Sequence, residues 1–249
     1  APALTANVAT RYFYQFVATG FPQPTFSLVG TPPPGLLFNP DTGVLSGAPT
    51  AEGSFTFGVI AANGVGSTGV LAGPFPMVVS PAFAAPQFTS GAPTSPALVN
   101  TPYSFTFTAS GYPAPTFRAS DLPTGLTLDS RTGVLSGTPT STGVYTFTVS
   151  AANQVDPDAV VAVRILVGAV PVFTNATPPV TSNVNSSYEY RFVASGFPAP
   201  TYSIDGTLPP GLTFDTNSGL LRGTLLSTGS YSFSVVATNN LHDGQAGGG

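Results

Sequence analysis

The sequence predicts an all-β protein built from three tandem antiparallel β-sandwich domains. Apolar and polar residues alternate along short segments, which is the two-residue period of strands with one buried face. Glycine and proline, with 28 and 27 residues in a chain of 249, interrupt these segments so often that no long helix fits between them. One block of residues recurs three times at spacings of 85 to 91 residues, so the chain repeats a single domain.

The alternation is clearest in the second repeat. Tyr103, Phe105 and Phe107 alternate with hydroxyl side chains, and residues 145–149 repeat the arrangement. Aromatic and β-branched residues suit a half-buried pleated surface, so these rings are expected to form the core. The pattern predicts a seven-stranded antiparallel sandwich, with strands at residues 87–91, 103–110, 116–119, 125–128, 134–137, 144–152 and 160–167.

Two motifs mark every repeat. The first is Gly-aromatic-Pro-x-Pro-Thr, at residues 20–25, 111–116 and 196–201. The second runs from Gly-Leu to Gly-x-Leu-x-Gly, at residues 35–47, 125–137 and 211–223. Together with the Gly-x-Tyr-x-Phe-x-Val segment of the second repeat, they resemble the He_PIG type of repeat of bacterial surface proteins, a relative of cadherin-like modules. The resemblance spans nearly the whole chain and implies immunoglobulin-like sandwiches in an elongated array.

The repeats predict three domains, at residues 1–80, 86–168 and 171–249. Ala1 aligns with Ala92, so the first repeat is expected to lack its first strand. The third repeat reaches a glycine-rich tail where its last strand is due, so that strand is expected to be missing. Because an unpaired sheet edge favours association, two interpretations stay open: a piece of a longer array, or strands supplied by neighbouring chains.

The composition excludes several classes of partner. Charged residues make up 6% of the chain and all six basic residues are arginines, whereas an ordinary soluble domain carries about 25% charged residues. Nucleic-acid binding is not expected, because it requires clustered basic side chains. No apolar run approaches the length of about 20 residues that a membrane-spanning helix needs. Without cysteine, the chain has no disulfide and no thiolate metal site.

Few residues could support catalysis. The one histidine, His242, lies in the glycine-rich tail, beyond the last predicted strand. Asp129 and Asp215 occupy a turn that Asn39 fills in the first repeat. An amide replaces a carboxylate more readily in a turn than in acid or base catalysis. We therefore expect no enzyme activity and no cofactor.

Asp156 and Asp158 form the one local acidic cluster, between the last two predicted strands of the second repeat. Cadherin-like relatives hold Ca²⁺ at such a position, so the resemblance implies a calcium site as one interpretation. Ca²⁺ takes about six to eight oxygen ligands, and the corresponding loops of the other repeats lack the acidic pair. The sequence therefore favours a polar turn here.

One set of aromatic residues falls outside the predicted strands. Phe21, Tyr112 and Phe197 lie in the loop of the first motif, which two prolines stiffen. We expect Tyr112 and Phe197 to pack against the preceding domain, with Val155 and Leu241 nearby, as interdomain contacts.

Glycosylation is the remaining chemistry that the sequence suggests. Asn175 and Asn185 each begin an Asn-x-Ser/Thr triplet, which is the acceptor for N-linked sugar. Such triplets arise easily by chance in a chain rich in serine and threonine.

The sequence predicts a non-catalytic structural segment of an extracellular surface fibre, filament or adhesin stalk, whose repeats act as spacers or self-assemble. The expected partners are neighbouring copies of itself or flanking repeats of the same longer chain, with a host or surface glycan as a further candidate. Extracellular or cell-surface placement follows from the resemblance. Two alternatives stay open: spacer or accessory repeats of a secreted polysaccharide-active enzyme, and a ligand-binding adhesin region.

Overall fold

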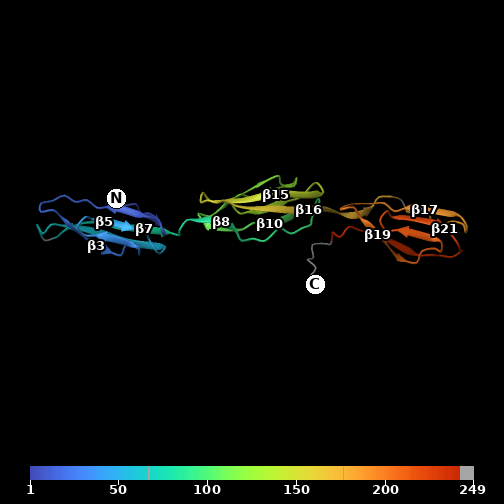
Figure 1. Ribbon diagram of the computed structural model, residues 1–249, viewed down its shortest axis with the longest axis horizontal. Coiled ribbons are helices and arrows are strands. Elements are labelled where there is room, and N and C mark those ends of the chain that lie inside the picture. The colour runs from blue at the N-terminus through green and yellow to red at the C-terminus, as the bar shows by residue number, and fades with distance from the viewer. Residues whose placement is uncertain (67, 176, 242–249) are drawn as a thin grey trace. The chain divides into compact units, whose positions relative to one another are not determined.

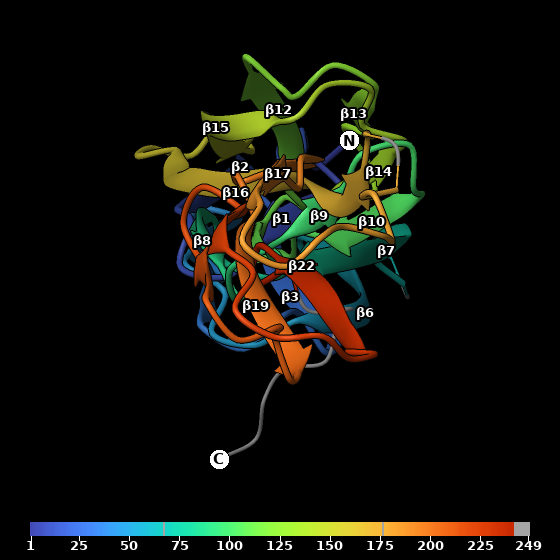
Figure 2. The same ribbon diagram turned by 90° about the vertical axis from the view of Figure 1, so that its right-hand side faces the viewer.

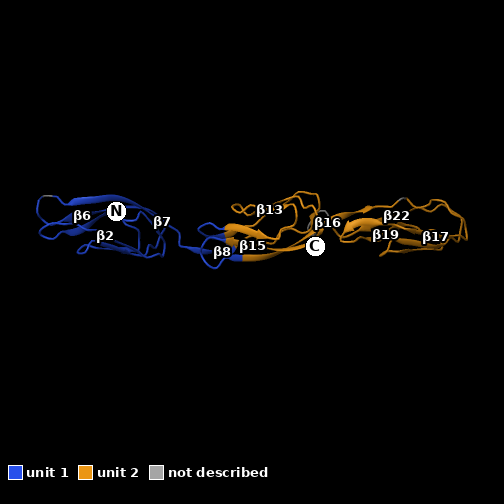
Figure 3. Cartoon of the chain, turned by 90° about the horizontal axis from the view of Figure 1, so that it is seen from above, with its two compact units in different colours: residues 1–87, 110–115, 152–159 blue, residues 88–109, 116–151, 160–249 orange. Residues whose placement is uncertain are grey.

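The computed structural model describes residues 1–66, 68–175 and 177–241. Regular structure in these residues consists of strands, β1 to β22, without a helix (Figure 1). The chain divides into two compact units (Figure 3). The first comprises residues 1–87, 110–115 and 152–159, and the second comprises residues 88–109, 116–151 and 160–249.

The first repeat is a sandwich of two sheets. One sheet has the order β1 (Thr5–Asn7), β7 (Val70–Ser80), β6 (Gly53–Ala62) and β3 (Thr25–Gly30). The other has the order β2 (Tyr12–Gln15), β5 (Val44–Gly47) and β4 (Leu36–Asn39). Both sheets contribute to one buried cluster, which contains Tyr12, Phe16, Leu36, Leu45, Phe57, Val59 and Met77. The inward-facing rings thus form the core, as the alternation predicts.

The second repeat has the same plan. Its sheets are β10 (Tyr103–Thr106), β14 (Val134–Gly137) and β13 (Leu126–Leu128), and β12 (Thr116–Ser120), β15 (Gly143–Ala152) and β16 (Ala159–Phe173). The most deeply buried side chains of this repeat include Phe107, Leu135, Phe147, Val149 and Ile165. The all-β fold class predicted from the sequence is confirmed.

Strand boundaries in this repeat differ from the prediction by more than one residue in three places. The predicted strand 103–110 is divided into β10 and β11 (Ala109–Tyr112), because its second half pairs with β8 (Ala84–Phe88) instead of β14. The first strand lies at 84–88 and not at 87–91. The last strand, β16, continues through residues 168–171, where its pairing passes to β18 (Ala194–Phe197).

Short parallel pairings depart from the antiparallel pattern. β9 (Ala97–Leu98) runs parallel to β16, with Ala97 opposite Val167. β1 runs parallel to β7 in the first repeat, with Thr5 opposite Val78. Segments of two or three residues are too short to show a period, so the sequence pattern did not reveal them.

The third repeat is less completely packed. β17 (Ser187–Arg191), β21 (Leu220–Thr224) and β20 (Leu212–Asp215) form one sheet. β19 (Thr201–Gly206) pairs with β22 (Phe233–Thr238), and Figure 2 shows these two strands. Among the described residues of this repeat, Leu221 and Tyr202 are the buried hydrophobic side chains, whereas Phe192 and Phe233 are half-buried. The domain boundaries at 80, 86, 168 and 171 stay a prediction.

A tyrosine at or next to the start of β2, β10 and β17 ties down the chain in each repeat. Its hydroxyl donates to a backbone carbonyl: Tyr12 to Ala3 at 3.1 Å, Tyr103 to Thr94 at 2.8 Å and Tyr188 to Pro179 at 3.1 Å. Burial raises the pKa of all three phenols above the ordinary value. The neutral hydroxyl is therefore the form that the fold stabilises.

Candidate functional site at the repeat ends

An asparagine directly follows β6, β15 and β22, one in each repeat. In the second repeat, Asn153 is 7% exposed, and its Nδ2 donates to the carbonyls of Ala84 at 2.9 Å and Pro113 at 2.7 Å. Its Oδ1 accepts a hydrogen bond from the N–H of Val155 at 3.1 Å. One side chain thus joins strand β8, the proline-rich aromatic loop and the loop that follows β15.

Asn239 makes the equivalent bonds in the third repeat. Its Nδ2 donates to the carbonyls of Ala169 at 2.8 Å and Pro198 at 3.0 Å, and its Oδ1 accepts from the N–H of Leu241 at 3.4 Å. Ala169 belongs to β16, whose end pairs with β18 in the register Ala169 to Phe197. The asparagine therefore fastens the incoming strand at the point where it enters the repeat.

The four residues predicted as interdomain contacts lie at these places. The Tyr112 and Phe83 ring centroids are 6.3 Å apart, and Val155 is half-buried beside Asn153. Phe197 and Leu241 are half-buried, and the Leu241 side chain lies directly against Gly168. The structure therefore places Tyr112 and Leu241 next to linker residues, each within its own compact unit. Their role between domains stays a prediction.

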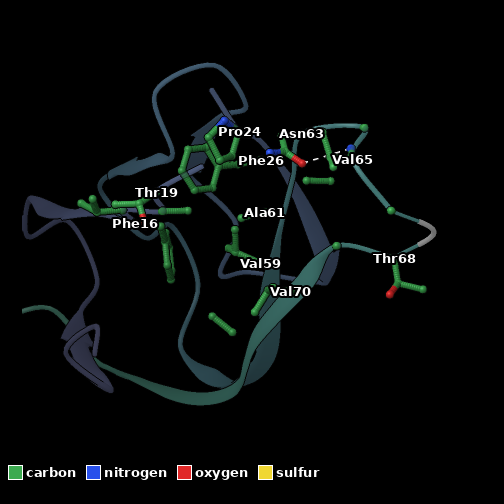
Figure 4. Close-up of a pocket in the computed structure, with 17 residues that line it drawn as sticks. Phe16, Thr19, Pro24, Phe26, Val59, Ala61, Asn63, Val65, Thr68 and Val70 are labelled. Atoms are coloured by element: carbon green, nitrogen blue, oxygen red, sulfur yellow. Dashed lines mark hydrogen bonds between the residues drawn. The ribbon is translucent and has the colours of Figure 1, made fainter. Parts of the chain in front are cut away.

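The first repeat differs at this end. Asn63 donates to the carbonyl of Pro22 at 3.1 Å and accepts from the N–H of Val65 at 3.1 Å. These two bonds correspond to those that Asn153 makes with Pro113 and Val155. Phe21, the counterpart of Tyr112, is 94% exposed. A cavity of about 710 Å³ opens here, and residues labelled in Figure 4 line it, among them Phe16, Thr19, Phe26, Val59 and Asn63.

The third repeat also contains a cavity, of about 750 Å³. It is lined by the segments 178–184 and 227–232 and by side chains that include Tyr188, Phe192, Leu212, Leu221 and Phe233. The lining of each cavity contains no acidic or basic side chain in the part of the chain that the structure describes. Among these residues, neither lining therefore offers the carboxylates or histidines that most often serve in acid–base or metal catalysis.

The acidic pair Asp156 and Asp158 is exposed. Among the described residues, no cluster of three or more His, Cys, Asp or Glu side chains could hold a metal ion. A calcium site at this pair stays a prediction, and the described residues add no third carboxylate, histidine or cysteine to it. His242 lies outside the described residues.

The recurring carboxylates Asp129 and Asp215 form turns. The Oδ1 of Asp129 accepts from the N–H groups of Thr132 at 2.8 Å and Arg131 at 2.9 Å, and these bonds hold the pKa of this carboxyl below its ordinary value. Backbone bonds within the turn likewise lower the pKa of Asp215. Asn39 makes the same bonds with an amide oxygen, to the N–H groups of residues 41 and 42. These acids stabilise turns, as the sequence predicts.

The two predicted glycosylation residues have different surroundings. The Asn175 amide is occupied: Nδ2 donates to the Tyr190 hydroxyl and to the Arg191 carbonyl, and Oδ1 accepts from the N–H of Val193 at 3.0 Å. Asn185 is exposed, and its φ of 64° places it in the left-handed region. Glycosylation stays a prediction at both. The geometry favours Asn185, because a sugar on Asn175 would replace a bonded amide hydrogen.

The asparagines after β6, β15 and β22 were not predicted from the sequence. Their recurrence at the same place in all three repeats was the sequence signal that could have identified them. Alignment of the repeats would have found them, whereas an amide is not among the residue types that point to catalysis.

A family model described as Putative Ig domain (He_PIG) matches the chain three times, at residues 2–74, 76–167 and 170–245. The matches cover nearly the whole chain and coincide with the sandwich architecture and the three sets of motifs. The protein belongs to this family of immunoglobulin-like repeats.

Known proteins are similar to this chain in sequence or in fold. The Serine-rich adhesin for platelets of Staphylococcus aureus strain USA300 is 32% identical over 146 residues, which is 55% of this chain and 6% of the adhesin. An I-band fragment from titin has a TM-score of 0.61 at 12% identity, and the match covers 96% of this chain and 91% of the titin fragment. Immunoglobulin domains 1–4 of Sidekick-1 have a TM-score of 0.53 at 18% identity, over 95% and 69% of the respective chains. At these identities the two solved structures show the fold alone.

The chain thus spans only a small part of the adhesin that it resembles. Its family and this similarity indicate a non-enzymatic repeat region. Within the described residues, no helix has the length and hydropathy needed to cross a membrane.

Proposed function

We propose that this chain is a structural segment of an extracellular adhesive surface protein, in which tandem immunoglobulin-like repeats form a stalk or filament. Membership of the He_PIG family and similarity to a bacterial surface adhesin support this role. The inert cavity linings support a non-catalytic segment.

The observation that carries the proposal is the continuous strand β16. Its 15 residues pair with β15 in the second repeat and with β18 in the third. Bending at this place would break ladder hydrogen bonds and the bond from Asn239 to Ala169, so the connection resists hinge motion. Resistance to bending between repeats is the property that a stalk needs.

The surface composition supports association with similar repeats. Charged residues make up 6% of the chain and the net charge is −4, so little electrostatic repulsion separates neighbouring copies. The proposed partners are flanking repeats of the same longer chain or copies of itself at the cell surface.

The stiffness of the connection is tested by residual dipolar couplings on the whole chain. We expect the second and third repeats to share one alignment tensor, and Asn239→Ala to make the two tensors diverge. Asn63→Ala is the matched control. It removes the equivalent side chain of the first repeat, whose hydrogen bonds go to Pro22 and Val65 and not to a strand that joins two repeats, so the tensors of the second and third repeats should stay unchanged. Independent tensors in the unmodified chain would contradict a stalk. Saturable binding to one glycan on an array would instead support a ligand-binding adhesin region.

A further inference from the structure

An exposed apolar row crosses the three-stranded sheet of the first repeat. Phe13 of β2, Ser46 of β5 and Leu37 of β4 lie side by side, because Ser46 is opposite both of the others in the strand register. Phe13 is 66% exposed and Leu37 is 77% exposed, and Ser46 is half-buried between them. The row lies on the outer face of the sheet, since the preceding residue of each strand belongs to the buried core cluster.

The other two repeats carry polar side chains at the same positions. The corresponding rows are Ser104, Ser136 and Thr127 in the second repeat, and Glu189, Arg222 and Thr213 in the third. The first and last residues of both rows are exposed, as they are in the first repeat. The exposure therefore belongs to this position of the fold, and the first repeat differs in the chemistry that it presents there.

The threonines of these rows have a local role that Leu37 lacks. Thr127 Oγ1 donates to the carbonyl of Ser136 at 3.4 Å, and Thr213 Oγ1 donates to that of Arg222 at 3.2 Å. Leucine cannot make this bond to the neighbouring strand. Because an exposed leucine also gains little burial within its own repeat, its apolar surface is available for a contact outside it.

The row ends at an open sheet edge. β4 is the outer strand of its sheet and pairs with β5 on one side. In the second repeat, the N–H of Asp129 donates to the carbonyl of Val134 at 2.9 Å, and Asn39 lies opposite Val44 in the same register. Since alternate residues of an antiparallel strand direct their backbone groups to opposite sides, Leu37 bonds toward β5 in the same way as Asn39.

The residues on either side of Leu37 therefore direct their backbone groups away from β5. The Leu36 N–H donates to the carbonyl of Pro33 at 3.2 Å. The Leu36 carbonyl and the Phe38 N–H face the open edge, one acceptor and one donor two residues apart. This arrangement suits the addition of another antiparallel strand.

A second copy of β4 fits this edge about a two-fold axis. With Leu37 opposite Leu37 of the other copy, the Phe38 N–H of each copy meets the Leu36 carbonyl of the other. The Cβ atoms of such directly opposed residues lie about 4.5–5.5 Å apart, so the two leucine side chains touch. The two three-stranded sheets then form one sheet with a continuous apolar row on its outer face.

The chemistry of the row favours a second copy over a charged partner. An interface with two-fold symmetry must be complementary to itself, and an uncharged row with leucine at the axis meets this condition. Glu189 and Arg222 place charges on the row of the third repeat, which is a common protection of an open edge. A stable interface buries about 1,200–2,000 Å², and one short strand from each copy supplies less, so we expect association only near about 0.1–1 mM.

We propose that the β4 edge of the first repeat, together with Phe13 and Leu37, is the surface on which a second copy of this chain docks by antiparallel pairing of β4 with β4. This inference rests on the proposed function and names the surface by which copies associate side by side. Its test involves only the first repeat, so its failure would leave the stiffness of the connection through β16 unaffected.

The first test is sedimentation equilibrium of the whole chain over about 0.01–2 mM. We expect a reversible monomer–dimer equilibrium. Leu37→Thr introduces the residue of the other two repeats and should weaken the dimer at least about tenfold, because each copy loses an apolar contact. Phe13→Ser should weaken it about three- to tenfold, since the ring lies one strand further from the axis. Val78→Thr is the matched control: Val78 is 47% exposed on β7 of the other sheet, and its replacement should leave the equilibrium unchanged.

The second test locates the contact by NMR. In a mixture of labelled and unlabelled chains, we expect nuclear Overhauser effects between the Leu37 methyl groups of two copies. Amide hydrogen exchange at Phe38 should slow as the protein concentration rises, whereas exchange at Leu128, its counterpart in the second repeat, should not change.

Three results would overturn the proposal. One is a chain that stays monomeric over the whole concentration range, and another is equal association of Leu37→Thr and Val78→Thr. The third is a dimer in which Phe38 gains no protection, because the edges would then not be paired. A monomeric chain that loses binding to a glycan in Leu37→Thr would assign this face to a sugar instead.

Discussion

Replacing Asn153 by alanine should destabilise the second repeat more than the same change at Asn63 destabilises the first. The Asn153 side chain is 7% exposed and makes three hydrogen bonds, at 2.9, 2.7 and 3.1 Å. Each typically contributes about 0.5–1.5 kcal/mol, so Asn153→Ala should lower the free energy of unfolding by about 2–4 kcal/mol. This lies below the stability of a typical domain, about 5–15 kcal/mol, so the repeat should remain folded.

The matched control is Asn63→Ala, in the equivalent position of the first repeat. Asn63 is less buried and makes two hydrogen bonds, both exposed and neither to an incoming strand, so its loss should cost about 1–2 kcal/mol. Asn153→Asp is the second comparison, because it keeps the size and the acceptor but turns a carboxylate toward two carbonyl oxygens. We expect it to destabilise at least as much as alanine.

The assay is native-state hydrogen exchange combined with urea denaturation. In Asn153→Ala, protection should be lost first in β8 and β11, because the amide fastens Ala84 and Pro113. Equal destabilisation by Asn153→Ala and Asn63→Ala would refute the reasoning, since the bond to the incoming strand would then contribute nothing. A decrease of less than about 1 kcal/mol in the free energy of unfolding of Asn153→Ala would also refute it.

Two further predictions concern recurring positions. Tyr103→Phe removes the 2.8 Å bond to Thr94 and should cost about 1 kcal/mol in urea denaturation. Burial raises the pKa of Tyr103 in the folded state, so its contribution is present below the unfolded value near 10 and is lost as the pH rises through the folded value. The unmodified second repeat should therefore weaken at alkaline pH more than Tyr103→Phe does, and parallel pH curves would contradict this. Ala9 has φ 62°, where its counterparts Asn100 and Asn185 have φ 58° and 64°. Because asparagine tolerates the left-handed region better than alanine, Ala9→Asn should raise the stability of the first repeat by about 0.5–1 kcal/mol in thermal unfolding, and a decrease would count against it.

The turns and core strands were predictable because their determinants are local. Tyr103, Phe105 and Phe107 alternate along a single segment, and Asp129 binds N–H groups two and three residues ahead. Such contacts depend on the order of neighbouring residues, which a repeating sequence shows three times over.

The candidate site was less predictable because its partners are distant in the chain. Asn153 binds Ala84, 69 residues away, and Asn239 binds Ala169, 70 residues away. Nothing in the neighbourhood of either asparagine indicates that partner. The sequence pattern indicated the aromatic residues of the loop, Tyr112 and Phe197, but not the amides that bind beside them.

By itself, the sequence determined the all-β class, the threefold repetition and the inward-facing rings, because strand alternation and turn chemistry are encoded by adjacent residues. Only the tertiary structure decided that β16 continues from one repeat into the next and that Asn153 and Asn239 bind backbone carbonyls 69 and 70 residues away. Both features depend on which backbone groups meet across the sheets, and that is set by the packing of segments far apart in the chain.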